Sequence, residues 1–260
     1  MNLKLNNRYA LVCGSTAGIG KATAMALAAE GVQVTLIARN EDKLKSALQE
    51  LPQQRAHDYI VADFSDPSAL QSKVSNYISD HHGFHILVNN TGGPAGGPVF
   101  SAEISAFESA FTQHLKCNHV LAQTLVPFMK DEGYGRIINV ISTSVKQPLD
   151  GLGVSNTIRG AVANWSKTLA NELGQFNITV NNVLPGATST ERLAEIIKNK
   201  SLKLGISVEE ASKAMKNTVP VKRFAMPEEI ANAITFLASE SASYINGINL
   251  PVDGGRTKSL

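Results

Sequence analysis

Gly14-Ser-Thr-Ala-Gly18-Ile-Gly20 is the stretch on which the interpretation of this 260-residue sequence depends. It follows a short apolar run at 8–13 and precedes 21–30, where Ala and Leu recur at helical spacing. A strand that passes through a glycine-rich turn into a helix lets the backbone approach a diphosphate at the helix N-terminus. The spacing Gly-x3-Gly-x-Gly differs from the commoner Gly-x-Gly-x-x-Gly, and a strand-to-helix turn without a ligand is the alternative.

The alternation of strands and helices continues along the chain. We expect strands at 8–13, 32–38, 58–62, 86–89, 136–141, 179–184 and 248–252, and helices at 21–30, 41–51, 68–81, 105–131, 155–174 and 227–239. The pattern predicts an α/β fold, a doubly wound Rossmann-type parallel sheet of about seven strands flanked by helices. Length alone leaves one or two domains open, but no Pro/Ser-rich linker or repeat divides the chain. We therefore expect a single domain over residues 1–260.

Residues 191–218 depart from this alternation. They contain two short amphipathic helical stretches, rich in Lys and Leu, between a strand and the last helix. Insertions of this kind often act as lids. We expect a helical lid that closes over an amphipathic or acidic substrate, with the covering of apolar surface as the alternative.

Composition excludes several classes of protein. Twenty-four Lys and Arg stand against 22 Asp and Glu, so the net charge of +2 gives no excess of the kind that nucleic-acid or membrane-surface binding needs. Cys13 and Cys117 are too few and too far apart in sequence for a disulfide framework or a metal cluster. With no signal peptide and no apolar run of about 18 residues, we expect a soluble cytoplasmic protein with no metal, nucleic-acid or membrane partner.

Three further segments carry a resemblance to a known family. They are Asn89-Asn-Thr-Gly92, Pro185-Gly186, and a tail from Arg223-Phe-Ala-Met-Pro-Glu-Glu-Ile-Ala to Val252-Asp-Gly-Gly255. With the glycine turn they resemble the short-chain dehydrogenase/reductase family, and the tail is similar to its 3-oxoacyl-acyl-carrier-protein reductases. The resemblance covers essentially the whole chain. It implies hydride transfer between a nicotinamide cofactor and a small-molecule carbonyl or alcohol substrate, in a homotetramer or, failing that, a dimer.

The resemblance also implies which residues contact the cofactor. They follow the glycine turn, the acid that meets the adenine, the stretch along the ribose and the segment beside the nicotinamide and diphosphate. The matching positions are Gly14, Ser15, Gly18, Ile19, Gly20, Asp63, Asn89, Thr91, Gly92, Pro185, Gly186 and Thr190. Two positions differ from the family pattern, since Thr91 replaces an Ala and Cys13 replaces the usual Thr.

The end of the second predicted strand bears on the choice of cofactor. An NAD site has a carboxylate there for the ribose 2′-hydroxyl, whereas a 2′-phosphate needs a cation and no carboxylate. Ala38 occupies the place of the acid, and Arg39 follows with a guanidinium suited to phosphate. We therefore expect NADP(H) to be favoured over NAD(H), with a solvated surface arginine as the alternative interpretation of Arg39.

The family's catalytic pattern is incomplete in this chain. It consists of a Ser, a Tyr 13 residues later, a Lys four residues after the Tyr, and an Asn on the preceding helix. Ser142 is present, but Ser155 and Arg159 occupy the Tyr and Lys positions and His114 occupies the Asn position. Residues 166–173 match the family without a gap, so the register is not in doubt. No Tyr lies anywhere from 135 to 243 that could replace the missing one.

These replacements change the acid/base chemistry that the chain can perform. A Ser hydroxyl is a far weaker acid than a phenol, and losing a positioned general acid typically costs about 10²- to 10⁴-fold in rate. Arg159 stays charged and can bind the nicotinamide ribose or an anionic substrate group. The unperturbed pKa of His114 suits acid/base work at neutral pH, so we hypothesise that it relays a proton through water, and a structurally packed His is the alternative. A reductase with an altered catalytic set and a catalytically silent NADP-binding scaffold or sensor protein both remain open.

Overall fold

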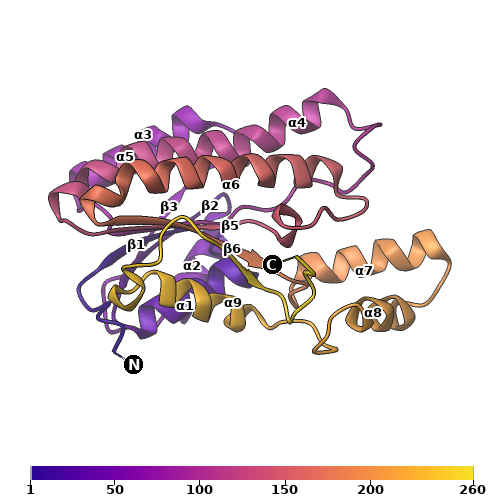
Figure 1. The fold of residues 1–260 in the computed structure, drawn as a ribbon. Helices are drawn as coiled ribbons and strands as arrows, with labels where there is room; N and C mark the ends of the chain where they lie inside the picture. The colour runs from indigo at the N-terminus through magenta and orange to yellow at the C-terminus, as the bar shows by residue number, and fades with distance from the viewer. Residues whose placement is uncertain (1, 260) are drawn as a thin grey trace.

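A parallel sheet of seven strands forms the centre of the computed structural model, which describes residues 2–259 (Figure 1). The strands lie in the order β3-β2-β1-β4-β5-β6-β7, and each pairs in parallel with its neighbours. Their bounds are β1 Tyr9–Cys13, β2 Gln33–Ala38, β3 Asp58–Val61, β4 Ile86–Asn89, β5 Gly135–Val140, β6 Ile178–Pro185 and β7 Asn249–Val252. The predicted doubly wound Rossmann-type sheet is confirmed.

Helices cover both faces of this sheet, as the ribbon in Figure 1 shows. Helices α3, α4, α5 and α6 lie on one face, and α1, α2 and α9 lie on the other. Their bounds are α1 Gly18–Ala29, α2 Glu41–Glu50, α3 Pro67–Asp80, α4 Ile104–Phe111, α5 Cys117–Asp131, α6 Gly153–Leu173 and α9 Pro227–Leu237. Each parallel pair needs a crossover connection, and these helices supply it.

Two apolar cores, one on each face, hold the layers together. All residues of β4 and β5 are buried, which is typical of a parallel sheet covered on both sides. One core joins the sheet to α1, α2 and α9 through residues such as Leu27 and Ile234, and the other joins it to α3, α5 and α6 through residues such as Leu121. Burying each such side chain contributes about 1.5–3 kcal/mol.

The sheet order brings the predicted site residues to one edge. Strand β1 pairs with β2 on one side and with β4 on the other, so the strands that follow in sequence are added first on one side of β1 and then on the other. In such folds ligands bind beyond the carboxyl ends of the strands at this point. The segments that follow β1, β4, β5 and β6 all leave the sheet at this edge.

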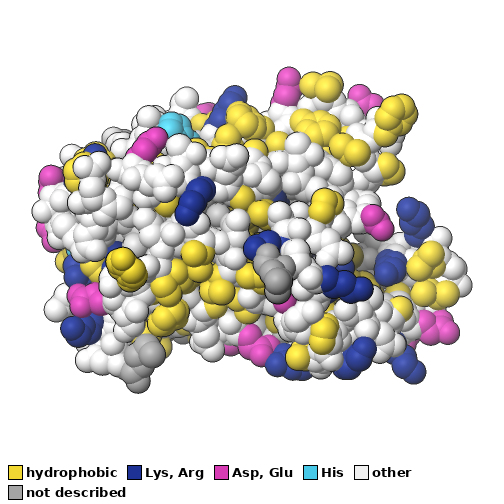
Figure 2. All heavy atoms as spheres, in the orientation of Figure 1, with side chains coloured by type: hydrophobic (Ala, Val, Ile, Leu, Met, Phe, Trp, Pro, Cys, Tyr) yellow, Lys and Arg dark blue, Asp and Glu magenta, His cyan; other side chains and the backbone are white. Residues whose placement is uncertain are grey.

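Two helices project beyond the end of the sheet, at the right of Figure 1. They are α7 Glu191–Leu204 and α8 Val208–Asn217, and they pack on each other through a small apolar cluster that includes Leu193, Ile197 and Ala211. Leu202 and Leu204 are exposed on them, and Figure 2 shows Lys and Arg side chains spread over this part of the surface. The two helical stretches expected in 191–218 are therefore present, and their action as a lid remains a prediction. Within residues 2–259 no helix is both long and apolar enough to cross a membrane.

The single helix expected at 105–131 is wrong in one respect. The structure divides it into α4 and α5 by a π-helical turn, η1 Thr112–Lys116. A π turn adds one residue per turn and is often found at functional sites. The apolar spacing continues on both sides of the turn, so hydrophobic periodicity does not reveal it. The difference matters because His114 lies within η1.

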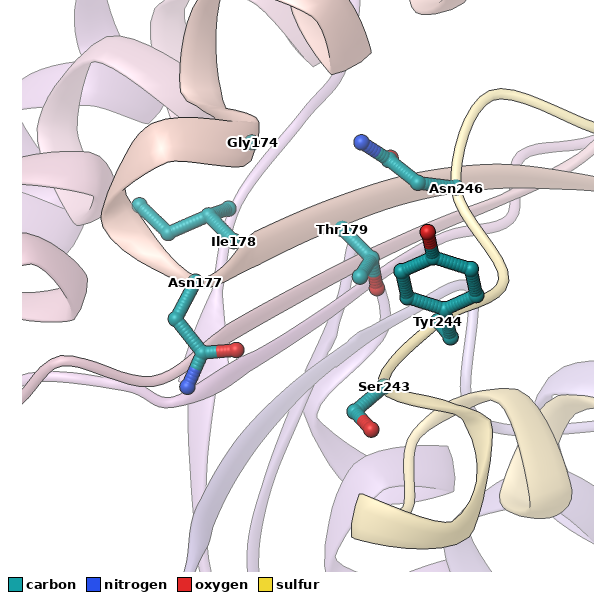
Figure 3. Close-up of a pocket in the computed structure, with 7 residues that line it drawn as sticks. All are labelled: Gly174, Asn177, Ile178, Thr179, Ser243, Tyr244 and Asn246. Carbon is teal, nitrogen blue, oxygen red and sulfur yellow. The ribbon is translucent and has the colours of Figure 1, made fainter.

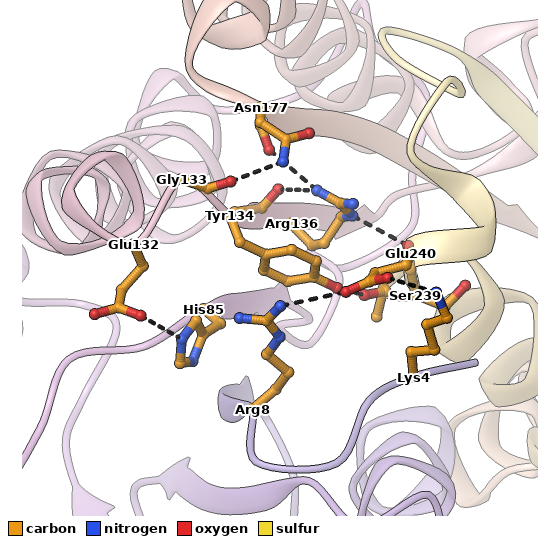
Figure 4. A network of polar contacts seen from close by, with 12 residues as sticks. Lys4, Arg8, His85, Glu132, Gly133, Tyr134, Arg136, Asn177, Ser239 and Glu240 are labelled. Atoms are coloured by element: carbon orange, nitrogen blue, oxygen red, sulfur yellow. Dashed lines mark hydrogen bonds and ion pairs between the residues drawn. The ribbon is translucent and has the colours of Figure 1, made fainter. Parts of the chain in front are cut away.

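A buried arginine ties β5 to the end of α9 at the opposite edge of the sheet (Figure 4). Arg136 is 1% exposed, its Nε donates a hydrogen bond to the Ser239 carbonyl, and its Nη1 donates to the Gly135 and Asn177 carbonyls. Its guanidinium also lies 4.1 Å from the centre of the Tyr134 ring. This cation is therefore satisfied entirely by the fold around it.

Replacing Arg136 by Met should lower the free energy of unfolding by about 2–4 kcal/mol, because it leaves buried carbonyl acceptors without a donor. Urea unfolding followed by far-UV circular dichroism measures the change. Lys4→Met is the matched control, since Lys4 belongs to the same network but is largely exposed and should change stability by less than about 0.5 kcal/mol. An Arg136→Met protein as stable as the control would contradict this account of the network.

Candidate active site at the carboxyl edge of the sheet

The turn between β1 and α1 has room only for glycine at two positions. Gly14 has φ of +58°, and a Cβ there would lie 2.3 Å from the Asn90 carbonyl oxygen. A Cβ on Gly20 would lie 2.2 Å from the carbonyl oxygen of Gly14. Helix α1 then begins without a side-chain cap, because Ala17 precedes it. Backbone N–H groups of its first turn therefore have no helix partner and can bind an anion such as a diphosphate.

The other residues predicted in this turn have mixed surroundings. The hydroxyl of Ser15 is buried and accepts a hydrogen bond from the Ile37 N–H, which ties the turn to β2. Ile19 packs against the core on the α1 face. A Cβ on Gly18 would lie 3.1 Å from Cγ2 of Thr190, so the segment after β6 lies against the turn. Direct cofactor contacts by these residues remain predictions.

Arg39 and Asp63 lie close together beyond the ends of β2 and β3. The Ser65 N–H, which donates to the Asp63 carboxylate, holds the pKa of Asp63 below its usual range, and the charge of Arg39 contributes to the same shift. Arg39 is exposed, and among residues 2–259 no carboxylate forms an ion pair with it within 4 Å. Its guanidinium is therefore available to an external phosphate.

The segment after β4 joins the turn to the middle of the sheet. Asn89 donates a hydrogen bond of 2.8 Å to the side chain of Asn139, and its own Oδ1 is buried without a partner among the described residues. Asn90, which the sequence interpretation passed over, donates to the carbonyls of Cys13 and Gly14. Its position between Asn89 and Thr91, two predicted site residues of the quoted motif, was the sequence feature that could have identified it. The glycine cradle and this orphaned oxygen both fit a bound nucleotide.

The segment after β6 completes this edge. Gly186 donates its N–H to the Val252 carbonyl, and a Cβ on it would lie 2.7 Å from Cα of Asp253, so no side chain fits there. Pro185 ends β6, and the Thr190 hydroxyl caps α7 by accepting from the Leu193 N–H. These positions lie where the resemblance expects the nicotinamide contacts, which remain predictions.

Ser142, Ser155 and Arg159 come from the end of β5 and the start of α6. The Ser142 hydroxyl accepts a hydrogen bond of 3.1 Å from the Ser144 N–H. Ser155 is half-buried in the first turn of α6. Arg159, one turn further on, is buried, and its Nη1 donates to the Val140 carbonyl at 3.1 Å. Burial lowers the pKa of Arg159 to about 10, so it remains a cation at neutral pH.

His114 contacts Thr91, the other position at which the resemblance expects a different side chain. Its Nδ1 lies 2.6 Å from the hydroxyl oxygen of Thr91. An Ala at position 91 would offer no such partner, so the two unusual residues belong together. Sequence spacing gives no sign of this pair, because the contact depends on how η1 packs beside β4.

The environment of His114 corrects one expectation. Its ring is 2% exposed, and burial, with a smaller effect from the charge of Arg159, lowers its pKa to about 3. The unperturbed pKa that suits acid/base work at neutral pH therefore does not apply in this environment, because the protonated ring would lose its hydration, and the role of His114 as a relay stays a prediction. At physiological pH His114 is a neutral imidazole bonded to Thr91. A water-mediated proton relay would have to pass through that neutral form.

A cavity of about 200 Å³ lies away from this edge (Figure 3). It is formed where α6 leads into β6 and by the segment before β7. The residues that line it are Gly174, Asn177, Ile178, Thr179, Ser243, Tyr244 and Asn246. It contains none of the predicted site residues. Among residues 2–259 no group of three or more His, Cys, Asp and Glu side chains is placed to hold a metal ion.

The low pKa of His114 predicts a specific pH dependence of stability. Below about pH 6.5 the unfolded chain protonates this His while the folded protein does not, so stability is full above that pH and falls toward pH 3 by up to about 1.4 kcal/mol per unit. His114→Gln removes the titration and keeps a partner for Thr91. The stability difference between wild type and this variant, from urea unfolding at each pH, should be constant above pH 7 and change steadily from pH 6 to 4. A difference that stays flat over that range would refute the buried neutral state.

Comparison with known proteins adds an independent line of support for these observations. Residues 14–257 match a family model described as enoyl-(acyl carrier protein) reductase. The chain is 30% identical to the NADPH-dependent reductase BacG of Bacillus subtilis, with 98% of this chain and 100% of that protein covered. It is 32% identical to the L-xylulose reductase of Caenorhabditis elegans, with 98% and 97% covered. The structure of L-sorbose reductase from Gluconobacter frateurii complexed with NADPH and L-sorbose superposes with a TM-score of 0.94, 32% identity and 100% of both chains covered.

Proposed function

The chain belongs to the short-chain dehydrogenase/reductase family, and from that premise we propose that it is an NADP(H)-dependent oxidoreductase that reduces a small-molecule carbonyl. NADPH, when bound, supplies the hydride. The relatives support this cofactor, since BacG is named an NADPH-dependent reductase and the L-sorbose reductase structure contains NADPH. A 3-oxoacyl compound or a similar carbonyl is the substrate class that the resemblance of the tail favours.

The observation that carries the proposal is the combination of a side-chain-free turn with an unpaired cation. Gly14 and Gly20 leave the N-terminus of α1 open to a diphosphate, and Arg39 lies at the end of the neighbouring strand without an ion-pair partner among the described residues. A 2′-phosphate needs that cation and would be repelled by the carboxylate of an NAD site. Asp63, close enough to Arg39 for that charge to lower its pKa, would contact the adenine.

The acid/base set is the part of the proposal in which this chain differs from its family. Ser155 and Arg159 occupy the positions of the Tyr and the Lys on the first turns of α6, and Ser142 follows β5. Ser142 can donate a hydrogen bond to a carbonyl oxygen, and Arg159 can stabilise negative charge there or bind the nicotinamide ribose. His114 would hydrogen-bond Thr91. Any proton that it exchanged through water would have to pass through the neutral imidazole. We expect slow reduction, with hydride transfer driven mainly by proximity.

A catalytically silent NADP-binding scaffold or sensor is the second candidate. The observation that favours it is the absence of a Tyr from 135 to 243 in the sequence. A half-buried Ser155 occupies the position where the family resemblance expects that Tyr. Turnover separates the two functions, because both require the cofactor.

Helices α7 and α8 are proposed to act as the lid of this site. Arg192, in the first turn of α7, donates a hydrogen bond of 3.1 Å from Nη2 to the Pro94 carbonyl, which belongs to the segment after β4. This bond joins the two segments that flank the edge of the sheet. For the assembly we keep the homotetramer expected from the family, with a dimer as the next possibility.

Cofactor choice is tested by titrating NADPH and NADH into wild type and Arg39→Ala, followed by nucleotide fluorescence. Losing charge-assisted hydrogen bonds to the 2′-phosphate should weaken NADPH binding by about 10- to 100-fold and leave NADH unchanged. Lys43→Ala removes an exposed cation from the adjacent helix and serves as the control. Equal loss for both nucleotides, or no loss from wild type, would count against the role of Arg39.

Catalysis is tested by restoring the missing acid. With NADPH and a panel of carbonyl compounds that includes 3-oxoacyl thioesters, Ser155→Tyr combined with Arg159→Lys should reduce at least one compound about 10²-fold faster than wild type. Ser155→Phe with Arg159→Lys supplies the ring without the hydroxyl and is the matched control. If the Phe variant is as fast as the Tyr variant, these positions are not the acid/base set. If wild-type protein binds NADPH but oxidises no NADPH with any compound of the panel, the result would favour the silent scaffold.

A further inference from the structure

The structure contains two buried arginines that differ in how many hydrogen bonds the fold gives them. Arg136 is held by three backbone carbonyls and by the Tyr134 ring, in a network that also includes Glu240 (Figure 4). Among the described residues the Arg159 side chain makes one hydrogen bond, from Nη1 to the Val140 carbonyl. Among residues 2–259 no carboxylate forms an ion pair with Arg159, and burial alone accounts for the direction of its pKa shift.

The groups near Arg159 do not compensate its charge. His114, whose pKa the Arg159 charge helps to lower, is neutral and hydrogen-bonded to Thr91. A Cβ on Gly93 would lie 3.9 Å from Nη2, and a glycine brings no charge to that side. A buried cation without a counter-ion costs several kcal/mol, about the cost of leaving one member of a buried ion pair alone. Because Arg159 lies beside the predicted catalytic residues, its uncompensated charge points to a ligand that supplies the missing anion.

We propose that Arg159 binds a carboxylate of the substrate, so that the carbonyl compound reduced by this protein is an oxo acid. The inference rests on the proposed function and narrows its small-molecule carbonyl to an oxo acid, which carries the free carboxylate that a 3-oxoacyl thioester lacks. A guanidinium presents parallel N–H donors that match the two oxygens of a carboxylate, and only one of its donors is used by Val140. Arg159 retains 8% exposure, so the side chain is not sealed from the edge of the sheet.

The cofactor's own phosphates are expected elsewhere. The diphosphate belongs at the turn of Gly14 and Gly20 after β1, and the 2′-phosphate belongs at Arg39 after β2. Arg159 comes from α6 and bonds to the last residue of β5, two strands beyond β1 on the other side of the switch point. The anion at Arg159 is therefore a group of the substrate and not of the nucleotide. An oxo acid also differs from L-xylulose and L-sorbose, the neutral sugars in the names of two relatives.

The test compares carboxylates with their neutral amides at matched ionic strength. Acetate, oxamate and succinate are titrated against acetamide, oxamide and succinamide, with binding followed by thermal shift and by protein NMR, in the presence and absence of NADPH. The proteins are wild type, Arg159→Met and Arg159→Lys. The Met variant removes an uncompensated charge and should unfold at the same or a higher temperature than wild type, unlike Arg136→Met, so a folding failure is not expected. The Lys variant keeps the cation, so it measures how much of any carboxylate preference depends on charge alone.

In wild type at least one carboxylate should bind about tenfold or more tightly than its amide, the factor expected for one charge-assisted hydrogen bond. Arg159→Met should abolish this preference, and Arg159→Lys should retain part of it. The proposal is overturned if no carboxylate is preferred by wild type, or if Arg159→Met keeps the preference.

The same titrations separate this inference from the proposed function. Binding of NADPH with no carboxylate preference refutes the oxo-acid inference and leaves the NADP(H) site in place. A carboxylate preference that depends on Arg159, in a protein that does not bind NADPH, supports the anion site and refutes the proposed function.

Discussion

The close approach of the β1–α1 turn to the segment after β4 is the contact on which the site depends. Gly14 adopts a left-handed conformation, and the space that its Cβ would need is filled by the carbonyl of Asn90. Gly20 is packed in the same way against Gly14. Since no side chain intervenes, the first turn of α1 points its free N–H groups at the edge where the crossovers reverse. The other site residues lie in segments that begin at that same edge, because all seven strands are parallel.

Burial decides what the unusual residues of this site can do. His114 would titrate near neutral pH in water, but burial, with a smaller effect from the charge of Arg159, keeps it neutral, and Thr91 supplies a partner for its ring. Arg159 stays charged under the same burial, because the pKa of a guanidinium is ordinarily so high that the lowered value of about 10 is still well above neutral pH. The site therefore combines a permanent cation with a neutral imidazole. That combination favours binding and polarising an anionic substrate over donating a proton to it.

The sequence predicted the architecture well, because strand and helix periodicity is a local property. Strands and helices were placed within a few residues, and the turn at 14–20 was identified with its neighbours. The π turn at Thr112–Lys116 was missed, since one extra residue per turn leaves the apolar spacing intact on both sides. The His114–Thr91 pair and the isolation of Arg159 were also out of reach, because they depend on packing between elements distant in sequence. The family pattern identified these positions but not their environments.

A crystal structure of the protein with bound NADPH would test the central claim most directly, since the claim is that one edge of the sheet holds the whole cofactor. The account predicts the diphosphate at the N-terminus of α1, the 2′-phosphate within hydrogen-bond distance of Arg39, and the nicotinamide between Gly186 and the start of α6. NADPH bound elsewhere, or bound with its 2′-phosphate directed away from Arg39, would contradict it.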